Sequence, residues 1–158
     1  MNSILEAAIL SKDRLGKHIS LIYRYSQIFF NVQLKKYNLG SGQYIFLISL
    51  FENNGISQEQ LSDIVKFDKA TTARAVAKLI NEKYVIREVN ESDKRAYNLY
   101  TTDKAESIKN ELFEILDSWN QIMLDKLERQ DRENLINLIE KVGKNILSQA
   151  NQMGEKAY

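Results

Sequence analysis

Hydrophobic positions at the start of the chain follow the period of an α-helix. Between Ile4 and about Tyr37, apolar residues recur at steps of three and four positions, with lysine, arginine and serine between them. This spacing predicts one long amphipathic helix. The segment NLGSGQ, residues 38–43, ends it because two glycines favour a turn, and Ser41 is expected to cap the next helix. The apolar run QYIFLISLFEN, residues 43–53, predicts a short buried helix.

Two compact helices separated by a tight turn are predicted next. In SQEQLSDIV, Ser57 and Gln60 have the spacing of a capping box, which satisfies free N–H groups at a helix start. This helix is expected to end near Lys66, and Asp68 is the expected N-cap of the following one. The inward face of that second helix is expected to be Ala73, Val76, Ala77, Leu79 and Ile80. The pair is a candidate helix-turn-helix.

The hydrophobic period then changes to that of a β-strand. In YVIREVNESDKRAYNLYT, residues 84–101, apolar positions alternate on both sides of a polar, turn-rich segment, which predicts a two-stranded hairpin packed on the helices. The helical period returns after Thr102, an expected N-cap, and Asp131 is expected to cap a last helix. The predicted fold class is therefore mainly α with a small β-hairpin.

The composition is that of an ordinary globular domain. Of the 158 residues, 44% are hydrophobic and 27% are charged, which is far from the signature of disorder. No apolar run approaches the roughly 20 residues needed to span a bilayer, and the chain start lacks the basic and small-residue segments of a secretory signal. We therefore expect a cytoplasmic protein with no membrane partner.

The residues that enzymes use most often are scarce. The chain has one histidine, no cysteine and no glycine-rich phosphate loop, which removes the usual nucleophile, metal and nucleotide signatures. Glu59 and Asp63 could serve as an acid and a base, but two carboxylates four residues apart on an exposed helix are more often solvated. We expect no enzymatic activity, no cofactor and no metal site.

A nucleic-acid partner is indicated by where the charges lie, since 22 basic residues balance 21 acidic ones. A helix that enters the major groove of DNA needs short hydrogen-bonding groups and cations near its N-terminus. The second helix of the helix-turn-helix carries these at Lys69, Thr71, Thr72, Arg74 and Lys78. For any single residue, a solvated surface position explains the pattern at least as well.

The hairpin adds a second group of charges. Arg87 lies on its first strand, and Lys94 and Arg95 lie at its tip. An arginine on a short arm beside a recognition helix can enter the narrow minor groove. Asp93 is expected to hold the guanidinium of Arg95 by a charge-assisted hydrogen bond and so to orient it.

The apolar stripes of the first and last two helices are longer than a compact central unit can cover. A second copy of the chain is the simplest partner, because most soluble oligomers are homo-oligomers with two-fold symmetry. The prediction is a homodimer; the alternative is a closed monomeric bundle.

These features together resemble the MarR (multiple antibiotic resistance regulator) family of winged helix-turn-helix transcription factors. GISQEQLSDIVKFDKATTARAVAKLINEKYVIRE resembles the family's helix-turn-helix and first wing strand, and ESDKRAYNLYTTDKA resembles its wing motif, Asp-x-Arg. The resemblance implies that Thr71, Thr72 and Arg74 lie on the recognition helix, that Arg95 is the minor-groove arginine and that Asp93 orients it. Lys83 stands where the family usually has glycine, so a left-handed backbone is expected there.

The resemblance also implies a domain organisation for the single MarR-like chain, 1–158. Residues 41–101 are expected to form the winged DNA-binding lobe, and residues 1–37 and 102–158 a helical dimerisation region. The implied function is a transcriptional regulator, expected to be a repressor, that binds a pseudo-palindromic operator in double-stranded DNA.

Members of the family are released from DNA by oxidants that act on cysteine or by small aromatic or phenolic effectors. Only the second route is open to a chain without cysteine. The candidate effector-binding residues are His18, Tyr23, Arg24, Tyr44 and Trp119. An aromatic residue at helical spacing is more often part of the core, and a lone histidine is more often structural, so the structural interpretation is favoured for them.

A rival hypothesis is a winged-helix protein-interaction module that does not bind DNA, because a fold does not determine a function. A module of that kind would not need both a basic, threonine-bearing recognition helix and Arg95.

Overall fold

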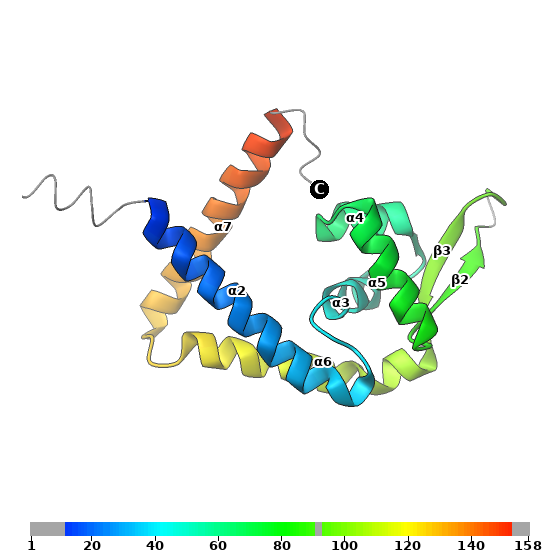
Figure 1. Cartoon of the computed structure of the whole chain (residues 1–158), viewed down its shortest axis with the longest axis horizontal. Helices are drawn as coiled ribbons and strands as arrows, with labels where there is room; N and C mark the ends of the chain where they lie inside the picture. The colour runs from blue at the N-terminus through cyan, green and yellow to red at the C-terminus, as the bar shows by residue number, and fades with distance from the viewer. Residues whose placement is uncertain (1–11, 91–92, 153–158) are drawn as a thin grey trace, which may run out of the picture. The chain divides into compact units, whose positions relative to one another are not determined.

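The computed structural model describes residues 12–90 and 93–152, with side chains from residue 15 to residue 149. The chain divides into two compact units, Met1–Ser41 and Gly42–Tyr158. The described residues are mostly helical and include one small antiparallel sheet (Figure 1). This confirms the predicted fold class.

The first unit contains one long helix, α2 (Lys12–Leu34), and a short 3-10 turn, η1 (Lys35–Tyr37). The predicted helix is confirmed from Lys12 onward, and its part between residues 4 and 11 lies outside the described residues. Asn38 ends the turn in a left-handed conformation, with φ of 56°. The backbone N–H of Ser41 donates to Asn31 Oδ1 at 2.8 Å.

Helix α3 (Tyr44–Glu52) opens the second unit and is buried at Phe46, Leu47 and Leu50. Its N-cap is Gln43, which makes no side-chain capping hydrogen bond, so the prediction that Ser41 caps it was wrong. Ser41 lies two residues before the cap position, too early for its hydroxyl to reach the first free N–H groups of the helix.

The helix-turn-helix consists of α4 (Gln58–Val65) and α5 (Lys69–Asn81). The predicted capping box is confirmed: Ser57 Oγ accepts from the Gln60 N–H at 3.1 Å, and Gln60 Oε1 accepts from the Ser57 N–H at 2.8 Å. Lys66 ends α4 with a left-handed φ of 57°, and Asp68 caps α5 as predicted. Only three residues therefore separate the two helices.

The buried face of α5 differs from the predicted one. It consists of Thr72, Ala75, Val76 and Leu79. Ala77, which was expected to face inward, is exposed, so that prediction was wrong. The buried stripe starts one residue earlier than expected. Because each helical residue adds about 100°, the buried face of α5 is rotated about the helix axis by roughly that angle from the predicted face.

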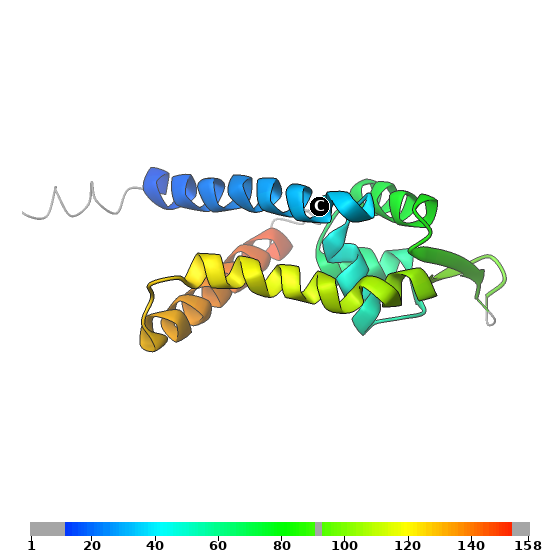
Figure 2. The ribbon, with the colours of Figure 1, turned by 90° about the horizontal axis from the view of Figure 1, so that it is seen from below.

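The hairpin is confirmed as β2 (Val85–Val89) paired with β3 (Tyr97–Thr101), with Arg87 opposite Leu99. The sequence did not predict a third strand, β1 (Ile56–Ser57), which pairs with the other edge of β3 and gives the order β1-β3-β2. Two residues are too few to show a period in the sequence. Strands β2 and β3 extend away from α5 (Figure 2).

The second unit ends with two long helices, α6 (Asp103–Leu124) and α7 (Arg129–Gln152). Thr102 caps α6 as predicted, with its Oγ1 accepting from the Ala105 N–H at 3.3 Å. The prediction that Asp131 caps α7 was wrong, because the helix begins at Arg129 and Asp131 lies inside its first turn. No helix of the described residues is long and apolar enough to cross a membrane.

Gly55 is required by the backbone where β1 begins. Its φ is +85°, and an added Cβ would lie 2.9 Å from Tyr100 Cε1. Gly55→Ala is therefore expected to destabilise the protein by about 1–3 kcal/mol, measured by urea unfolding. Gly143→Ala is the matched control, since nothing lies within 4 Å of that position in α7 and alanine favours helix. Equal stability of the two variants would contradict the prediction.

Candidate nucleic-acid interface

The exposed side of α5 carries three of the predicted contact residues. Lys69, Arg74 and Lys78 are exposed, and Thr71 is half-buried. Arg74 Nη2 donates to Thr71 Oγ1 at 2.8 Å, which orients the guanidinium along the first turns of the helix. Lys78 Nζ lies 2.8 Å from Glu82 Oε1, four residues later. The helix thus presents cations to solvent along its length.

Thr72 does not belong to this surface, and its prediction as a contact residue is corrected. Its side chain is fully buried, and its hydroxyl donates to the Asp68 carbonyl at 3.0 Å. The rotation of α5 places Thr72 on the core side, where the carbonyl four residues earlier satisfies the hydroxyl.

The N-cap of α5 gives this region a pH dependence. Asp68 Oδ1 accepts from the Thr71 N–H at 2.8 Å, and hydrogen bonds from the Thr71 side chain and backbone hold the pKa of Asp68 below its ordinary value of 3.8. A lowered folded-state pKa contributes stability above the unfolded pKa, and this contribution is lost as pH falls through the folded pKa.

We therefore expect the wild type to be more stable than Asp68→Asn at pH 7 and to lose that advantage as the pH falls below about 4. Asparagine retains the capping oxygen but cannot titrate. Thermal unfolding of both proteins between pH 7 and pH 3 measures the difference. A constant difference across this range would contradict the assignment.

The wing is defined here as β2, β3 and the turn between them. In this turn, the Ala96 N–H donates to the Asp93 carbonyl at 2.9 Å, and the Asp93 N–H donates to Asn90 Oδ1 at 3.1 Å. The side chains of Asp93, Lys94 and Arg95 are exposed. Two cations therefore lie at the tip of a hydrogen-bonded turn.

Asp93 acts on the backbone of Arg95. Its Oδ1 accepts from the Arg95 N–H at 3.0 Å, the arrangement by which an aspartate commonly stabilises a turn. The expected bond to the guanidinium is corrected, since no ion pair joins the two residues in the described part of the chain. The acid shapes the turn that carries Arg95.

Arg87, on the solvent side of β2, is tied to the helix-turn-helix. Its Nη2 donates to Gln58 Oε1, in the first turn of α4, at 2.8 Å. The next residue, Glu59, accepts from Lys69 Nζ at 2.6 Å. Neither Gln58 nor Glu59 was predicted to contact the DNA-binding residues. The capping box predicted the helix turn on which Gln58 and Glu59 lie. Their partners Arg87 and Lys69 are 29 and 10 residues away, and no local sequence pattern indicates contacts over such separations.

Comparison with known proteins shows which family has this winged helix-turn-helix fold. The model of the family of SarA/Rot transcriptional regulators matches residues 28–112. The structure superimposes on a MarR transcriptional regulator from Methanosarcina mazei Go1 with a TM-score of 0.81 and 39% identity, over 87% of this chain and 99% of that one. The chain is a MarR-type transcriptional regulator of the SarA/Rot family.

Two further relatives of this MarR-type regulator are informative. The HTH-type transcriptional regulator YybA of Bacillus subtilis is 29% identical over 82% of this chain and 87% of its own. A MarR family regulator from Listeria monocytogenes, solved in complex with a 26-mer DNA, is 28% identical with a TM-score of 0.79, over 88% of this chain and 94% of that one. Such relatives are regulators and not enzymes, which confirms that the chain is not an enzyme.

Lys83 lies between α5 and β2 of the MarR-type chain, where hydrogen bonds to the start of α6 hold the backbone. Lys83 adopts the expected left-handed backbone, with φ of 62°. Three consecutive carbonyls there accept hydrogen bonds from the start of α6. Glu82 O accepts from Lys104 Nζ at 2.6 Å, Lys83 O from Thr102 Oγ1 at 2.7 Å, and Tyr84 O from the Thr102 N–H at 3.1 Å. These bonds fix the chain between the recognition helix and the wing.

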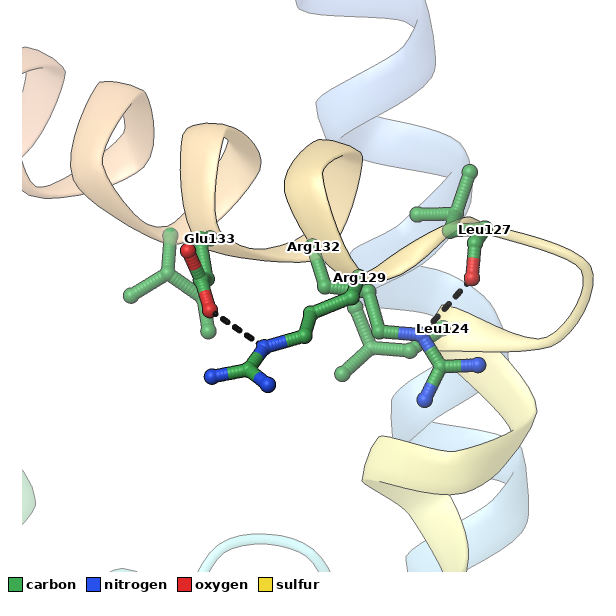
Figure 3. A pocket seen from close by; sticks show the side chains of 6 residues that line it. Leu124, Leu127, Arg129, Arg132 and Glu133 are labelled. Atoms are coloured by element: carbon green, nitrogen blue, oxygen red, sulfur yellow. Dashed lines mark hydrogen bonds and ion pairs between the residues drawn. The ribbon is translucent and has the colours of Figure 1, made fainter.

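The candidate effector residues of the regulator lie in both units. His18, Tyr23 and Arg24 are exposed on α2, whereas Tyr44 on α3 and Trp119 on α6 are half-buried. A hollow at the junction of α6 and α7 is lined by other residues, namely Leu124, Leu127, Arg129, Arg132, Glu133 and Ile136 (Figure 3). Both arginines form hydrogen bonds within this junction: Arg129 Nε donates to Glu133 Oε1 at 3.0 Å, and Arg132 Nε donates to the Leu127 carbonyl at 2.8 Å.

Proposed function

We propose that this regulator binds double-stranded DNA as a homodimer and represses transcription from a pseudo-palindromic operator. The observation that carries the proposal is the exposure of cations on both DNA-binding elements of a winged helix-turn-helix. Arg74 and Lys78 are exposed on α5, and Lys94 and Arg95 at the wing tip. The Listeria relative in complex with DNA supports it.

Each element suits a different groove. The first turns of α5 would enter the major groove, where Arg74 pairs with guanine or a phosphate and Thr71 contacts a phosphate or a thymine methyl. The wing would enter the flanking minor groove, whose negative potential is strongest in narrow A·T-rich tracts and attracts Arg95. Lys69, Lys78, Arg87 and Lys94 would bind phosphates and carry no sequence preference.

The proposed dimerisation region, residues 1–37 and 102–158, is supported by apolar side chains that α7 leaves in solvent. They include Ile136, Leu138, Ile139 and Ile146. A row of this kind favours a second copy, and two-fold symmetry gives half-sites about 10 to 11 base pairs apart, centre to centre. The winged lobe, residues 41–101, would then be presented twice.

Ile139→Glu is expected to convert the dimer to a monomer, because the side chain is 61% exposed in the single chain and a carboxylate would be desolvated at the interface. Sedimentation velocity measures the mass. Asn137→Glu, which adds the same charge at an exposed position on the opposite face of α7, should remain dimeric. A dimeric Ile139→Glu protein would argue against this interface.

The test of the function is selection of bound duplexes from a random DNA pool at near-physiological salt. Enrichment of an inverted repeat with the stated spacing is the expected result. If the purified dimer enriches no sequence and binds no duplex, the alternative of a winged-helix protein-interaction module is favoured. Repression is tested by placing the selected repeat across a promoter in a transcription assay. Activation of transcription by the protein would refute the proposed repressor role.

Release by a small aromatic or phenolic acid is the final part of the proposal. A ligand shifts DNA binding only by its differential affinity for the free and DNA-bound conformations. A screen of such acids against the selected operator is expected to find one whose effect is lost when Tyr44 or Trp119 is replaced by alanine. If no acid changes the affinity, effector release is excluded for this ligand class.

A further inference from the structure

The first turn of α4 contacts both DNA-binding elements through two adjacent side chains. Gln58 Oε1 accepts from Arg87 Nη2 of the wing at 2.8 Å, and Glu59 Oε1 accepts from Lys69 Nζ of the recognition helix at 2.6 Å. Helix α4 lies beside α5 within the second unit (Figure 1). One turn of one helix therefore contacts a cation on each element.

The backbone of this turn is well fixed. The capping box between Ser57 and Gln60 closes both of its hydrogen bonds, at 3.1 and 2.8 Å. Ser57 also belongs to β1 and pairs with Asn98 of β3. Gln58 and Glu59 thus project from a backbone that is held by the helix on one side and by the sheet on the other.

The two side chains differ in their effect on charge. Gln58 is neutral, so Arg87 keeps its full positive charge while its position is restrained. Glu59 is ionised, so it neutralises Lys69; its hydrogen bond and its charge raise the pKa of Lys69, to which the charge of Asp63 also contributes. The side chains of Lys69 and Glu59 are 71% and 63% exposed, and an ion pair this exposed opens readily.

We propose that Glu59 competes with DNA phosphates for Lys69 and thereby limits the affinity of the regulator for DNA of any sequence. The inference rests on the proposed function and adds a control to it. A phosphate that binds Lys69 must displace a carboxylate that is already 2.6 Å away, and the displaced carboxylate stays close to the DNA. Lys69 therefore contributes little to counterion release in the wild type, although it lies at the start of the recognition helix.

The test compares Glu59→Gln with the wild type on a duplex that lacks the selected operator. We expect the affinity of the variant to rise by up to about fivefold per subunit, the strength of a surface ion pair. The slope of log affinity against log salt should steepen by about 0.9 per subunit, as for one more phosphate contact. An unchanged or lower affinity would overturn the inference, because it would make Glu59 neutral or a positioning residue for Lys69.

Glu140→Gln is the matched control. Glu140 is 60% exposed and ion-paired with Lys144 at 3.9 Å on α7, so its replacement changes the net charge by the same amount. An equal gain in both variants would assign the effect to net charge and overturn the inference. Gln58→Ala should act in the opposite direction to Glu59→Gln, because it releases Arg87 without unmasking any charge.

A double-mutant cycle with Lys69→Met distinguishes competition from direct repulsion. If Glu59 acts through Lys69, the gain from Glu59→Gln disappears in the Lys69→Met background. A gain that persists would show that Glu59 repels DNA by itself. A wild type that binds no duplex at low salt would refute the proposed function and this inference together, whereas wild-type binding without any gain in Glu59→Gln refutes the inference alone.

Discussion

The variant Arg74→Ala, Arg95→Ala is expected to lose about 1,000-fold in affinity for the operator selected by the wild type. Each arginine contact of this kind contributes about 1–3 kcal/mol, and a dimer would make four of them. Even the low end of this range gives about three factors of ten. Competition binding at fixed salt, with the selected duplex and a scrambled one, measures both the affinity and the specificity.

The two single variants should differ in what they lose. Arg74→Ala is expected to relax the preference at one base position in each half-site, whereas Arg95→Ala should reduce the preference for A·T-rich flanks. The matched control is Lys141→Ala, Lys144→Ala, which removes two exposed cations from α7 instead. An equal loss in this control, or an equal loss on operator and scrambled duplexes, would contradict the assigned roles.

Local chemistry explains why the elements of the fold could be predicted from the sequence. The capping box of Ser57 and Gln60 and the N-caps Asp68 and Thr102 are all formed as expected, because each depends on residues three positions apart. Left-handed Lys83 was also expected, from the resemblance to the MarR family. Strand β1 was not, since its two residues are held by the partner strand and not by their own pattern.

The rotation of α5 shows where the sequence was ambiguous. The helix contains alanines at 70, 73, 75 and 77, and alanine fits either a buried or an exposed position. Two stripes one residue apart were therefore almost equally apolar. In the structure Thr72 lies on the buried stripe, where the Asp68 carbonyl accepts the hydrogen bond of its hydroxyl. Choosing the wrong one of these two faces as the buried face led to the predictions that Thr72 contacts DNA and that Ala77 lies in the core.

The candidate DNA-contacting residues could be predicted from residue type and position, but the side chains that hydrogen-bond to them could not. Exposed cations at Lys69, Arg74 and Arg95 follow from their positions in a helix and a turn. The contacts that restrain Arg87 and Lys69 join elements distant in sequence, so neither period nor capping could show them. Because these partners differ in charge, cations that look equivalent in the sequence are expected to contribute unequally to DNA affinity.

Thr102→Val is expected to destabilise the protein by about 1.5–3 kcal/mol. The threonine hydroxyl caps α6 by accepting from the Ala105 N–H and also donates to the Lys83 carbonyl at 2.7 Å. Valine has the same shape but neither hydrogen-bonding function, so the cap, worth about 0.5–2 kcal/mol, and a further hydrogen bond of about 1 kcal/mol are both lost. Urea unfolding at one protein concentration measures the difference.

Thr101→Val is the matched control for that loss. The neighbouring threonine lies at the end of β3, where a β-branched residue is favoured, and its hydroxyl makes one exposed hydrogen bond, to Glu106 Oε1 at 3.2 Å. Its replacement should change the stability by no more than about 0.5 kcal/mol. Thr102→Ser, which retains the hydroxyl, should recover most of the lost stability. If the two valine variants were equally stable, the hydrogen bonds of Thr102 would not fix the junction between recognition helix, wing and α6.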